Sequence, residues 1–110
     1  MAAQIDKKYP WIGQDEQELF NAILVLENLS EVKEFLVDML SPHEVKDFAR
    51  RWSVAKDLIR GKKSVDIVSK RDVSKNTVSR VKRSIVDYGS GMSQKICKRL
   101  EQKGLIDLQG

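Results

Sequence analysis

The stretch that decides the fold runs from Ser64 to Ile85 and reads SVDIVSKRDVSKNTVSRVKRSI. It predicts two short helices joined by a tight turn. Ser64 is a typical N-cap for the first helix, which we expect to end near Asp72. Val73 then follows as an apolar plug between the two helices. The apolar residues of the first helix form one small cluster: Val65, Ile67 and Val68.

The second helix of this stretch is apolar on one side and polar and basic on the other. Ser74 offers its N-cap, and residues spaced by three and four form the apolar stripe: Val78, Val81 and Ile85. At about 100° per residue, the opposite face holds Asn76, Ser79, Arg80 and Arg83, with Lys75 and Lys82 at its flanks. That face has hydrogen-bond donors and positive charge, and no carboxylate before Asp87. These are the features of a helix that enters the major groove of B-DNA.

The pattern V-S-x-x-T-V-S-R-V, which starts at Val73, resembles the helix-turn-helix of bacterial repressors. Two positions depart from the common form of that motif. Val68 stands where many such motifs have alanine, and Asp72 stands where the turn usually has glycine. Aspartate tolerates the left-handed conformation better than most residues, so we expect the turn to form. The alternative is an ordinary helical hairpin whose basic face is solvated.

The distribution of charge divides the chain in two. The 110 residues together carry a net charge of +4. Residues 1–49 contain 4 lysines and arginines and 10 acids, whereas residues 50–110 contain 16 and 6. The basic half contains the candidate motif. This asymmetry predicts a polyanion-binding half, joined to a half with another task, which we expect to be assembly.

Composition excludes several functional classes. Hydrophobic residues make up 41% of the chain, no apolar run approaches the length of a membrane span and no signal-peptide pattern is present, so we expect a cytoplasmic protein without a membrane partner. The single cysteine, Cys97, allows no internal disulfide, and with the single histidine, His43, it cannot supply an ordinary zinc site. No catalytic constellation and no glycine-rich phosphate loop is present. We therefore expect no enzymatic activity, no cofactor and no metal.

Residues 1–13 show no sustained period and predict an N-terminal arm. Its aromatic residues, Tyr9 and Trp11, need a surface to pack on, which the body of the protein or a second subunit would supply. The alternative is an arm that touches DNA through Lys7 and Lys8. From residue 14 to residue 110 we expect a single helical domain.

Three helices are expected between the arm and the reading motif. The first runs from Gln14 to about Asn28, and the second is capped by Ser30; both have wide apolar faces. The third opens with Ser41-Pro42-His43-Glu44, in which serine at N-cap, proline at N1 and glutamate at N3 form a capping box. It is expected to extend to Arg60, with Gly61 as the residue that ends it. Its predicted apolar face consists of Val45, Phe48, Ala49, Trp52, Ala55, Leu58 and Ile59.

One more helix is expected after the reading motif. Residues 87–91, DYGSG, are rich in turn formers and predict a break. The last helix is expected from Ser93 to Lys103, with Gly104 after it. We find no strand pattern, so the fold class is all-α with about six helices. A C₂ dimer would bury the wide apolar faces of the first three helices and would place two reading helices for a pair of twofold-related half-sites.

The order of elements resembles the Trp repressor superfamily from about Leu19 to Leu100, and most closely its uncharacterised Trp-repressor-like bacterial members. The segments that carry the resemblance are Leu40-Ser41-Pro42-x-Glu44, Arg51, Leu58-Ile59-Arg60-Gly61, Thr77-Val78-Ser79-Arg80 and Tyr88-Gly89. The resemblance implies an intertwined all-helical homodimer. It also implies operator binding through a helix-turn-helix reading head at residues 64–85.

The same resemblance implies an effector site at Ser41, Arg51, Arg80 and Ser84. In Trp repressor the corepressor indole lies between two arginines, which match Arg51 and Arg80, and a cap hydroxyl matches Ser41. The glycine that follows the second arginine is Val81 in this chain. An isopropyl group tends to close the slot that a glycine opens for a flat ring. L-tryptophan is therefore a candidate corepressor that Val81 disfavours.

These observations predict a sequence-specific DNA-binding transcriptional regulator, a repressor, that binds a two-half-site operator as a homodimer on the bacterial nucleoid. The predicted partner is double-stranded DNA, and the predicted contact residues are Lys62, Lys63, Ser74, Lys75, Asn76, Thr77, Ser79, Arg80, Lys82 and Arg83. One alternative is a helical protein-interaction module that docks an acidic partner on the basic hairpin. Another is a tryptophan-responsive repressor. A third is an RNA binder, although Tyr88 is the only aromatic residue after Trp52.

Overall fold

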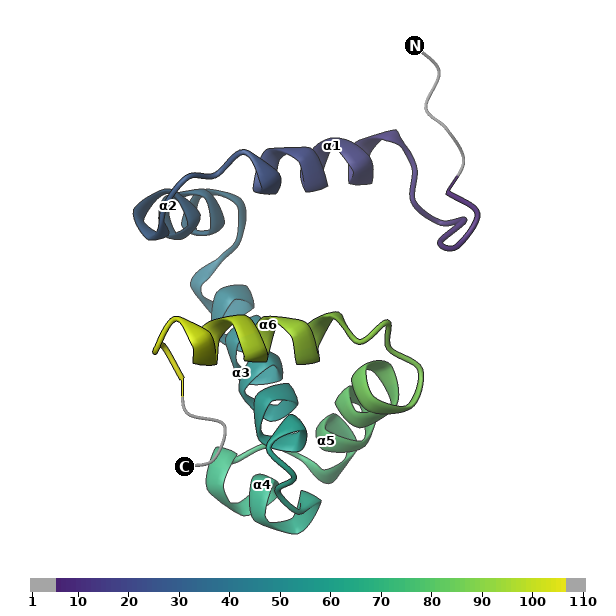
Figure 1. Ribbon diagram of the computed structural model, residues 1–110, viewed down its shortest axis with the longest axis vertical. Helices are drawn as coiled ribbons and strands as arrows, with labels where there is room; N and C mark the ends of the chain where they lie inside the picture. Colours follow the sequence, from purple (N-terminus) through teal and green to yellow (C-terminus); the bar gives the residue numbers. More distant parts are fainter. Residues whose placement is uncertain (1–5, 107–110) are drawn as a thin grey trace. The chain divides into compact units, whose positions relative to one another are not determined.

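The computed structural model describes residues 6–106, and this range contains helices and no strand (Figure 1). In chain order the elements are α1 (Gln14–Leu24), α2 (Leu29–Met39), α3 (Pro42–Ile59), α4 (Ser64–Arg71), α5 (Lys75–Lys82), the π-helical turn η1 (Arg83–Asp87) and α6 (Met92–Gln102). The prediction of an all-α fold with six helices is confirmed. The chain divides into two compact units between Pro42 and His43. The single domain expected for residues 14–110 stays a prediction.

The N-terminal unit begins with a short ordered part of the arm. Asp6 accepts hydrogen bonds from the backbone N–H groups of Lys8 (2.9 Å) and Tyr9 (2.8 Å). The rings of Tyr9 and Trp11 lie 6.3 Å apart, and the Lys8 ammonium lies 5.5 Å from the Tyr9 ring centre. Residues 1–5 of the predicted arm lie outside the described residues. The aromatic residues of the arm therefore contact each other.

Two boundaries in this unit differ from the prediction. Helix α1 ends at Leu24 and not near Asn28, because Asn28 caps α2: its side chain accepts the backbone N–H of Glu31 at 2.9 Å. The Glu31 carboxylate in turn accepts the N–H of Glu27 at 2.9 Å. Ser30 was predicted to be the cap, but it lies inside the first turn of α2. The sequence contains two candidate caps, and the Asn28 and Glu31 side chains together satisfy two backbone donors, the N–H groups of Glu31 and Glu27.

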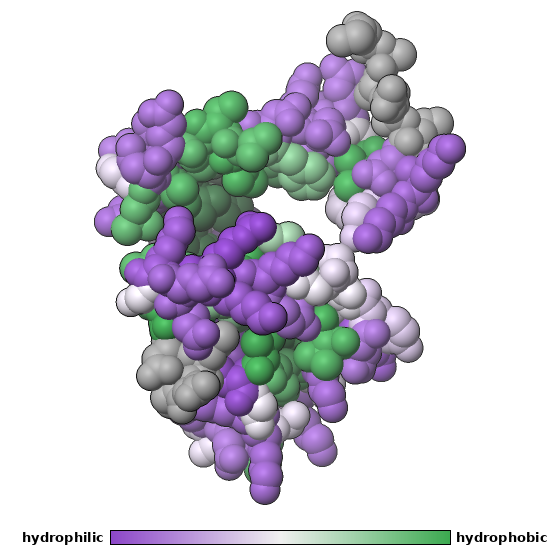
Figure 2. Space-filling view, in the orientation of Figure 1, coloured by the Kyte–Doolittle hydropathy of each residue, from purple (hydrophilic) through white to green (hydrophobic). Residues whose placement is uncertain are grey.

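The apolar side chains of α1 and α2 are not covered within this unit. Neither helix has a buried residue. Leu24 is 80% exposed, and Figure 2 shows hydrophobic side chains gathered along both helices. The other large apolar residues exposed here are Leu19, Phe20, Ile23, Val25, Leu29, Val32, Val37 and Met39. So large an exposed apolar area is typical of a surface that binds another protein.

Helix α3 begins at Pro42, as the capping-box pattern predicted, and is closed by a Schellman motif. Gly61 has φ +83°. Its N–H donates to the Leu58 carbonyl at 3.0 Å, and the Lys62 N–H donates to the Asp57 carbonyl at 3.1 Å. Gly61 was the predicted end residue, and this is confirmed. The turn sends the chain directly from α3 into α4.

The core of the C-terminal unit is small and is built around the reading motif. It consists of Val54, Ala55, Ile67, Val73, Val78 and Val81, with Trp52, Leu58, Val68 and Ile85 packed against it. Only the second half of α3 contributes to this cluster. Phe48, on the predicted apolar face of α3, is 59% exposed in the single chain. Val54, which the predicted apolar face omitted, is completely buried.

Helices α4 and α5 form the predicted pair across a tight turn. Asp72 adopts the left-handed conformation (φ 52°, ψ 49°), as expected for the residue in the usual place of glycine. Val73 is buried and plugs the turn. Ser64 is not the N-cap of α4: Lys63 occupies that position, without a side-chain hydrogen bond, and Ser64 is the first helical residue. The helix therefore starts one residue earlier than predicted.

The second helix of the pair was expected to continue regularly through Ile85. Instead, α5 ends at Lys82 and the chain forms a π-helical turn, in which the Tyr88 N–H donates to the Arg83 carbonyl at 3.0 Å. Gly89 follows it closely: a Cβ atom there would lie 2.4 Å from the Ile85 carbonyl oxygen. Helix α6 then runs from Met92 to Gln102, within one residue of its predicted bounds. Cys97 is completely buried, and burial raises the pKa of its thiol.

Candidate nucleic-acid interface

The predicted reading face of α5 lies on the surface of the C-terminal unit. Asn76, Ser79 and Arg80 are exposed, while Val78 and Val81 are buried in the core. The helix is therefore anchored by one side and presents the other. Lys75 and Lys82 at the flanks are also exposed. The orientation predicted from the 3.6-residue period is confirmed.

The start of α5 is fixed by the predicted cap. The Ser74 hydroxyl accepts the backbone N–H of Thr77 at 3.0 Å, and the two hydroxyl oxygens lie 2.8 Å apart. Both side chains were predicted to contact DNA. In this structure they hydrogen-bond to each other and hold the first turn of the helix. Their contact with DNA stays a prediction.

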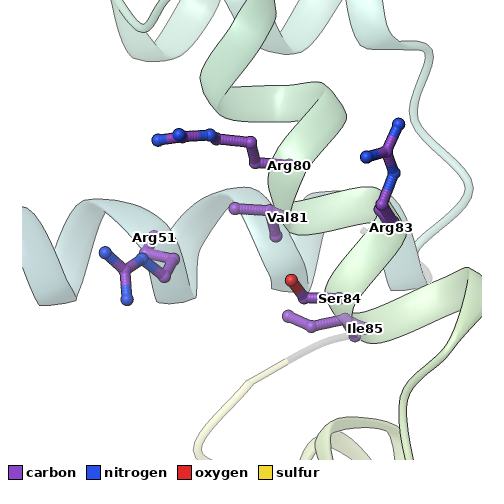
Figure 3. Close-up of a pocket in the computed structure, with 6 residues that line it drawn as sticks. All are labelled: Arg51, Arg80, Val81, Arg83, Ser84 and Ile85. Atoms are coloured by element: carbon purple, nitrogen blue, oxygen red, sulfur yellow. The ribbon is translucent and has the colours of Figure 1, made fainter.

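Arg83 belongs to the π-helical turn, which continues the reading face past the end of α5. In Figure 3 its side chain points away from Arg51 on α3. The ion pairs seen in the described part of the chain join His43 and Arg50 to Asp47, and Arg71 to Asp57, and none of these pairs involves Arg80 or Arg83. The stretch from Val73 to Val86 also contains no acid. The positive charge of this surface is thus not neutralised by the chain's own described side chains.

A hollow of about 420 Å³ lies beside the reading face (Figure 3). Its lining consists of Arg51 from α3, Arg80 and Val81 from α5, and Arg83, Ser84 and Ile85 from η1. Three of the four residues predicted for an effector site, Arg51, Arg80 and Ser84, are therefore brought together. Ser41 belongs to the N-terminal unit, and its part in such a site stays a prediction. Arg83 also lines this hollow, although it was not among the residues predicted for an effector site.

Val81 restricts this hollow. Its side chain is 4% exposed and belongs to the hydrophobic core, although it also lines the hollow. Figure 3 shows the Val81 side chain next to that of Arg80. A glycine at this position would lack the isopropyl group altogether. The space between the arginines is therefore partly filled by the protein itself.

The position of α4 against α3 is fixed by a buried ion pair that the sequence did not reveal. Arg71 donates to both carboxylate oxygens of Asp57, with Nε–Oδ2 at 2.8 Å and a terminal nitrogen to Oδ1 at 3.1 Å. Asp57 is completely buried. The hydrogen bond from Arg71 holds the pKa of Asp57 below its ordinary value, against the effect of burial, and the pKa of Arg71 is raised. Both groups are therefore charged near neutral pH.

Lys62 and Lys63 precede α4 and line a second hollow together with Lys70 from its last turn. The first two were predicted to lie near DNA phosphates. Lys70 was not predicted, because its proximity to Lys62 depends on the turn at Gly61 and on the Asp57–Arg71 pair. Nothing in the local sequence pattern indicates that these two lysines meet.

Comparison with known proteins assigns this chain to a family. The family model for the Trp repressor protein matches residues 14–101. This chain belongs to the Trp repressor family. It is 33% identical over 99 residues to the uncharacterised protein YerC of Bacillus subtilis strain 168, with 90% of this chain and 91% of that protein covered.

Two solved structures share the Trp repressor fold with this chain. A TrpR-like protein from Eubacterium eligens has a TM-score of 0.74 at 31% identity, covering 93% of this chain and 99% of its own. A candidate Trp repressor from Staphylococcus aureus has a TM-score of 0.75 at 31% identity, covering 92% and 97%. The predicted superfamily is confirmed. The members of the Trp repressor family share a regulatory DNA-binding fold, and the family is not an enzyme family. This agrees with the expected lack of enzymatic activity.

Two features are absent from residues 6–106. None of the helices there combines the length and the apolar character needed to cross a membrane. No three His, Cys, Asp or Glu side chains in that range lie close enough together to hold a metal ion.

Proposed function

We propose that this Trp repressor family member is a sequence-specific DNA-binding transcriptional regulator, and that it acts as a repressor. The observation that carries the proposal is the exposed face of α5 and η1, where Asn76, Ser79, Arg80 and Arg83 offer donors and unpaired positive charge. Arginine and asparagine are the side chains that read guanine and adenine edges in the major groove. Family membership supports the same conclusion.

The proposal includes a homodimer that binds two half-sites. Its support is the uncovered apolar surface of α1 and α2, together with Phe48 on α3. A second copy offers the same apolar surface, so a C₂ arrangement can cover both at once. Two reading heads related by a twofold axis match two half-sites about one helical turn apart. A regulator of this kind acts on the chromosome. We therefore also propose that the protein is located in the bacterial cytoplasm, at the nucleoid.

Selection from random-sequence duplexes at a stated salt concentration tests this function. The expected result is enrichment of one two-half-site sequence. RNA hairpins of equal length and an acidic polypeptide serve as competitors. Preferential binding to either competitor, or the absence of any enriched duplex at low salt, would refute the proposal in favour of RNA binding or of an acidic protein partner.

A second candidate function is control by a small effector in the hollow lined by Arg51, Arg80 and Ser84, since about 420 Å³ of space adjoins the reading helix there. Because the Val81 side chain fills part of the space that an indole ring would need, we propose that L-tryptophan has little effect on operator affinity. Calorimetry with L-tryptophan, on the natural chain and on Val81→Gly, tests this. Binding by the glycine variant alone is expected. A tenfold gain in operator affinity for the natural chain, about 1.4 kcal/mol of coupling, would contradict it.

A further inference from the structure

The hollow where α3 passes into α4 has a volume of about 490 Å³ and an excess of positive charge. Three lysines line it, Lys62, Lys63 and Lys70. Two aspartates, Asp57 and Asp66, also line it. The Asp57 carboxylate is already held through both oxygens by Arg71. Asp66 therefore remains as the one lining carboxylate not engaged by an arginine, against three lysines.

Asp57 holds the two ends of α4 around this hollow. Its backbone carbonyl accepts the N–H of Lys62 at 3.1 Å, which fixes the chain just before α4. Its carboxylate binds Arg71, the last residue of α4 and the neighbour of Lys70. Lys62 and Lys70 are eight residues apart in sequence but are drawn together by one anchor. Their proximity is built into the fold and is not a chance meeting of two long side chains.

The two lysines act on each other directly. Interaction with the Lys62 side chain, and then the charge of Lys62, lower the pKa of the Lys70 ammonium. Among the described residues, neither lysine forms an ion pair with a carboxylate. Two like charges held close together repel each other, and an anion between them would replace the repulsion by two attractions.

We propose that Lys62 and Lys70 together bind one phosphate group in this hollow. Phosphate oxygens accept several charge-assisted hydrogen bonds, and lysine binds phosphate as a compact point charge. The phosphate group comes from the DNA backbone, because α4 is the first helix of the reading motif and such helices cross the backbone. That source rests on the proposed function, whereas the phosphate site itself does not.

The first experiment uses the full chain without DNA. Inorganic pyrophosphate is titrated at constant ionic strength, with chloride as the balancing anion, while lysine side-chain and backbone amide resonances are followed by NMR. Saturable shifts at Lys62 and Lys70 are expected. Lys70→Gln should abolish saturation, while Lys95→Gln, an exposed lysine on α6, should leave it unchanged. Thermal unfolding of both variants verifies that they fold.

The second experiment measures duplex affinity against salt concentration. Each phosphate contact adds about one to the slope of log K against log [salt]. Lys62→Gln and Lys70→Gln should each lower the slope by about one, equally on selected and random duplexes, and the double variant should lose no more than either single variant. This non-additivity distinguishes one shared phosphate from two separate contacts. Lys95→Gln again serves as the control.

The two experiments separate the sources of the phosphate. A salt slope lowered by about one in each single variant, and no further in the double variant, supports the assignment to the DNA backbone. Additive losses in the double variant overturn the shared phosphate. Saturable pyrophosphate binding with an unchanged slope supports the site but overturns the DNA source in favour of a free phosphate compound. Absence of both effects overturns the proposal. If the natural chain binds no duplex at all, the proposed function fails, and the pyrophosphate titration alone decides whether the site exists.

Discussion

Arg71, the last residue of α4, donates two hydrogen bonds to the completely buried carboxylate of Asp57 on α3. The two residues are fourteen positions apart and join the helix that precedes the reading motif to the motif's first helix. The position of α5 depends on this pair, because α5 packs on α4 across the Asp72–Val73 turn. The geometry of the reading face thus rests on one buried ion pair and on a small apolar core.

Arg71→Met should destabilise the protein strongly. The substitution keeps much of the side-chain volume but leaves the buried Asp57 carboxylate without a partner, and breaking such a pair costs about 3–5 kcal/mol. Denaturant-induced unfolding measures the loss. Lys70→Met, one residue away and exposed, is the matched control and should change stability by no more than about 0.5 kcal/mol. Equal midpoints for the two variants would show that the ion pair contributes no stability.

The same pair predicts a dependence of stability on pH. Asp57 has a folded-state pKa below the ordinary value of 3.8, so the unfolded chain binds the proton first as pH falls. The contribution of Asp57 is therefore complete above about pH 5 and is lost as pH falls through the folded pKa. The stability difference between the natural chain and Asp57→Asn should be largest at neutral pH and shrink below about pH 4. Unfolding curves measured from neutral to acid pH test this, and a constant difference would contradict it.

The sequence predicted those parts of the fold that local chemistry determines. The Ser74 cap, the left-handed Asp72 and the Gly61 ending each depend on a few neighbouring residues, and each is confirmed. The exposed reading face followed from the helical period. Contacts between distant residues could not be predicted in this way. A charged residue is rarely buried without a partner, and nothing near Asp57 in the sequence identifies Arg71 as that partner.

Two other features required the structure for related reasons. No residue pattern in this stretch indicates the π-helical turn at Arg83–Asp87. A regular helix that continues to Ile85 would have the same apolar spacing. Phe48 shares the predicted apolar face of α3, but it is exposed and does not belong to the C-terminal core. An apolar pattern indicates that a helix face is buried, but it does not indicate whether the same chain or a second chain buries that face.

Gly89→Ala should destabilise the turn between η1 and α6. The added Cβ atom would lie 2.4 Å from the Ile85 carbonyl oxygen, so the backbone must shift. Overpacking of this kind costs about 1–3 kcal/mol. Gly13→Ala is the matched substitution, since its Cβ would meet Glu16 Oε1 only at 3.4 Å. Thermal unfolding compares the two variants, and a smaller loss for Gly89→Ala than for Gly13→Ala would contradict the tight approach seen here.

Leu24→Glu should weaken a homodimer without harming the single chain. Leu24 is 80% exposed in the N-terminal unit, so only burial by a partner would make a carboxylate there costly. The control is Val65→Glu, which is 71% exposed on α4. Sedimentation at micromolar concentration should find a dimer for the natural chain and for Val65→Glu, and at least tenfold weaker association, about 1.4 kcal/mol, for Leu24→Glu. A natural chain that sediments as a monomer would refute the proposed assembly.

The central claim, that the exposed face of α5 and η1 reads base sequence, is tested most directly by duplex affinities of Arg83→Ala and Lys75→Ala. Each variant is measured on the selected site and on random DNA over a range of salt concentrations. Arg83→Ala should lose about 1–3 kcal/mol on the selected site and much less on random DNA, because a base contact is lost. Lys75→Ala should lose equally on both and lower the salt slope by about one. Equal losses on both duplexes for Arg83→Ala, or no duplex binding by the natural chain at low salt, would contradict the account.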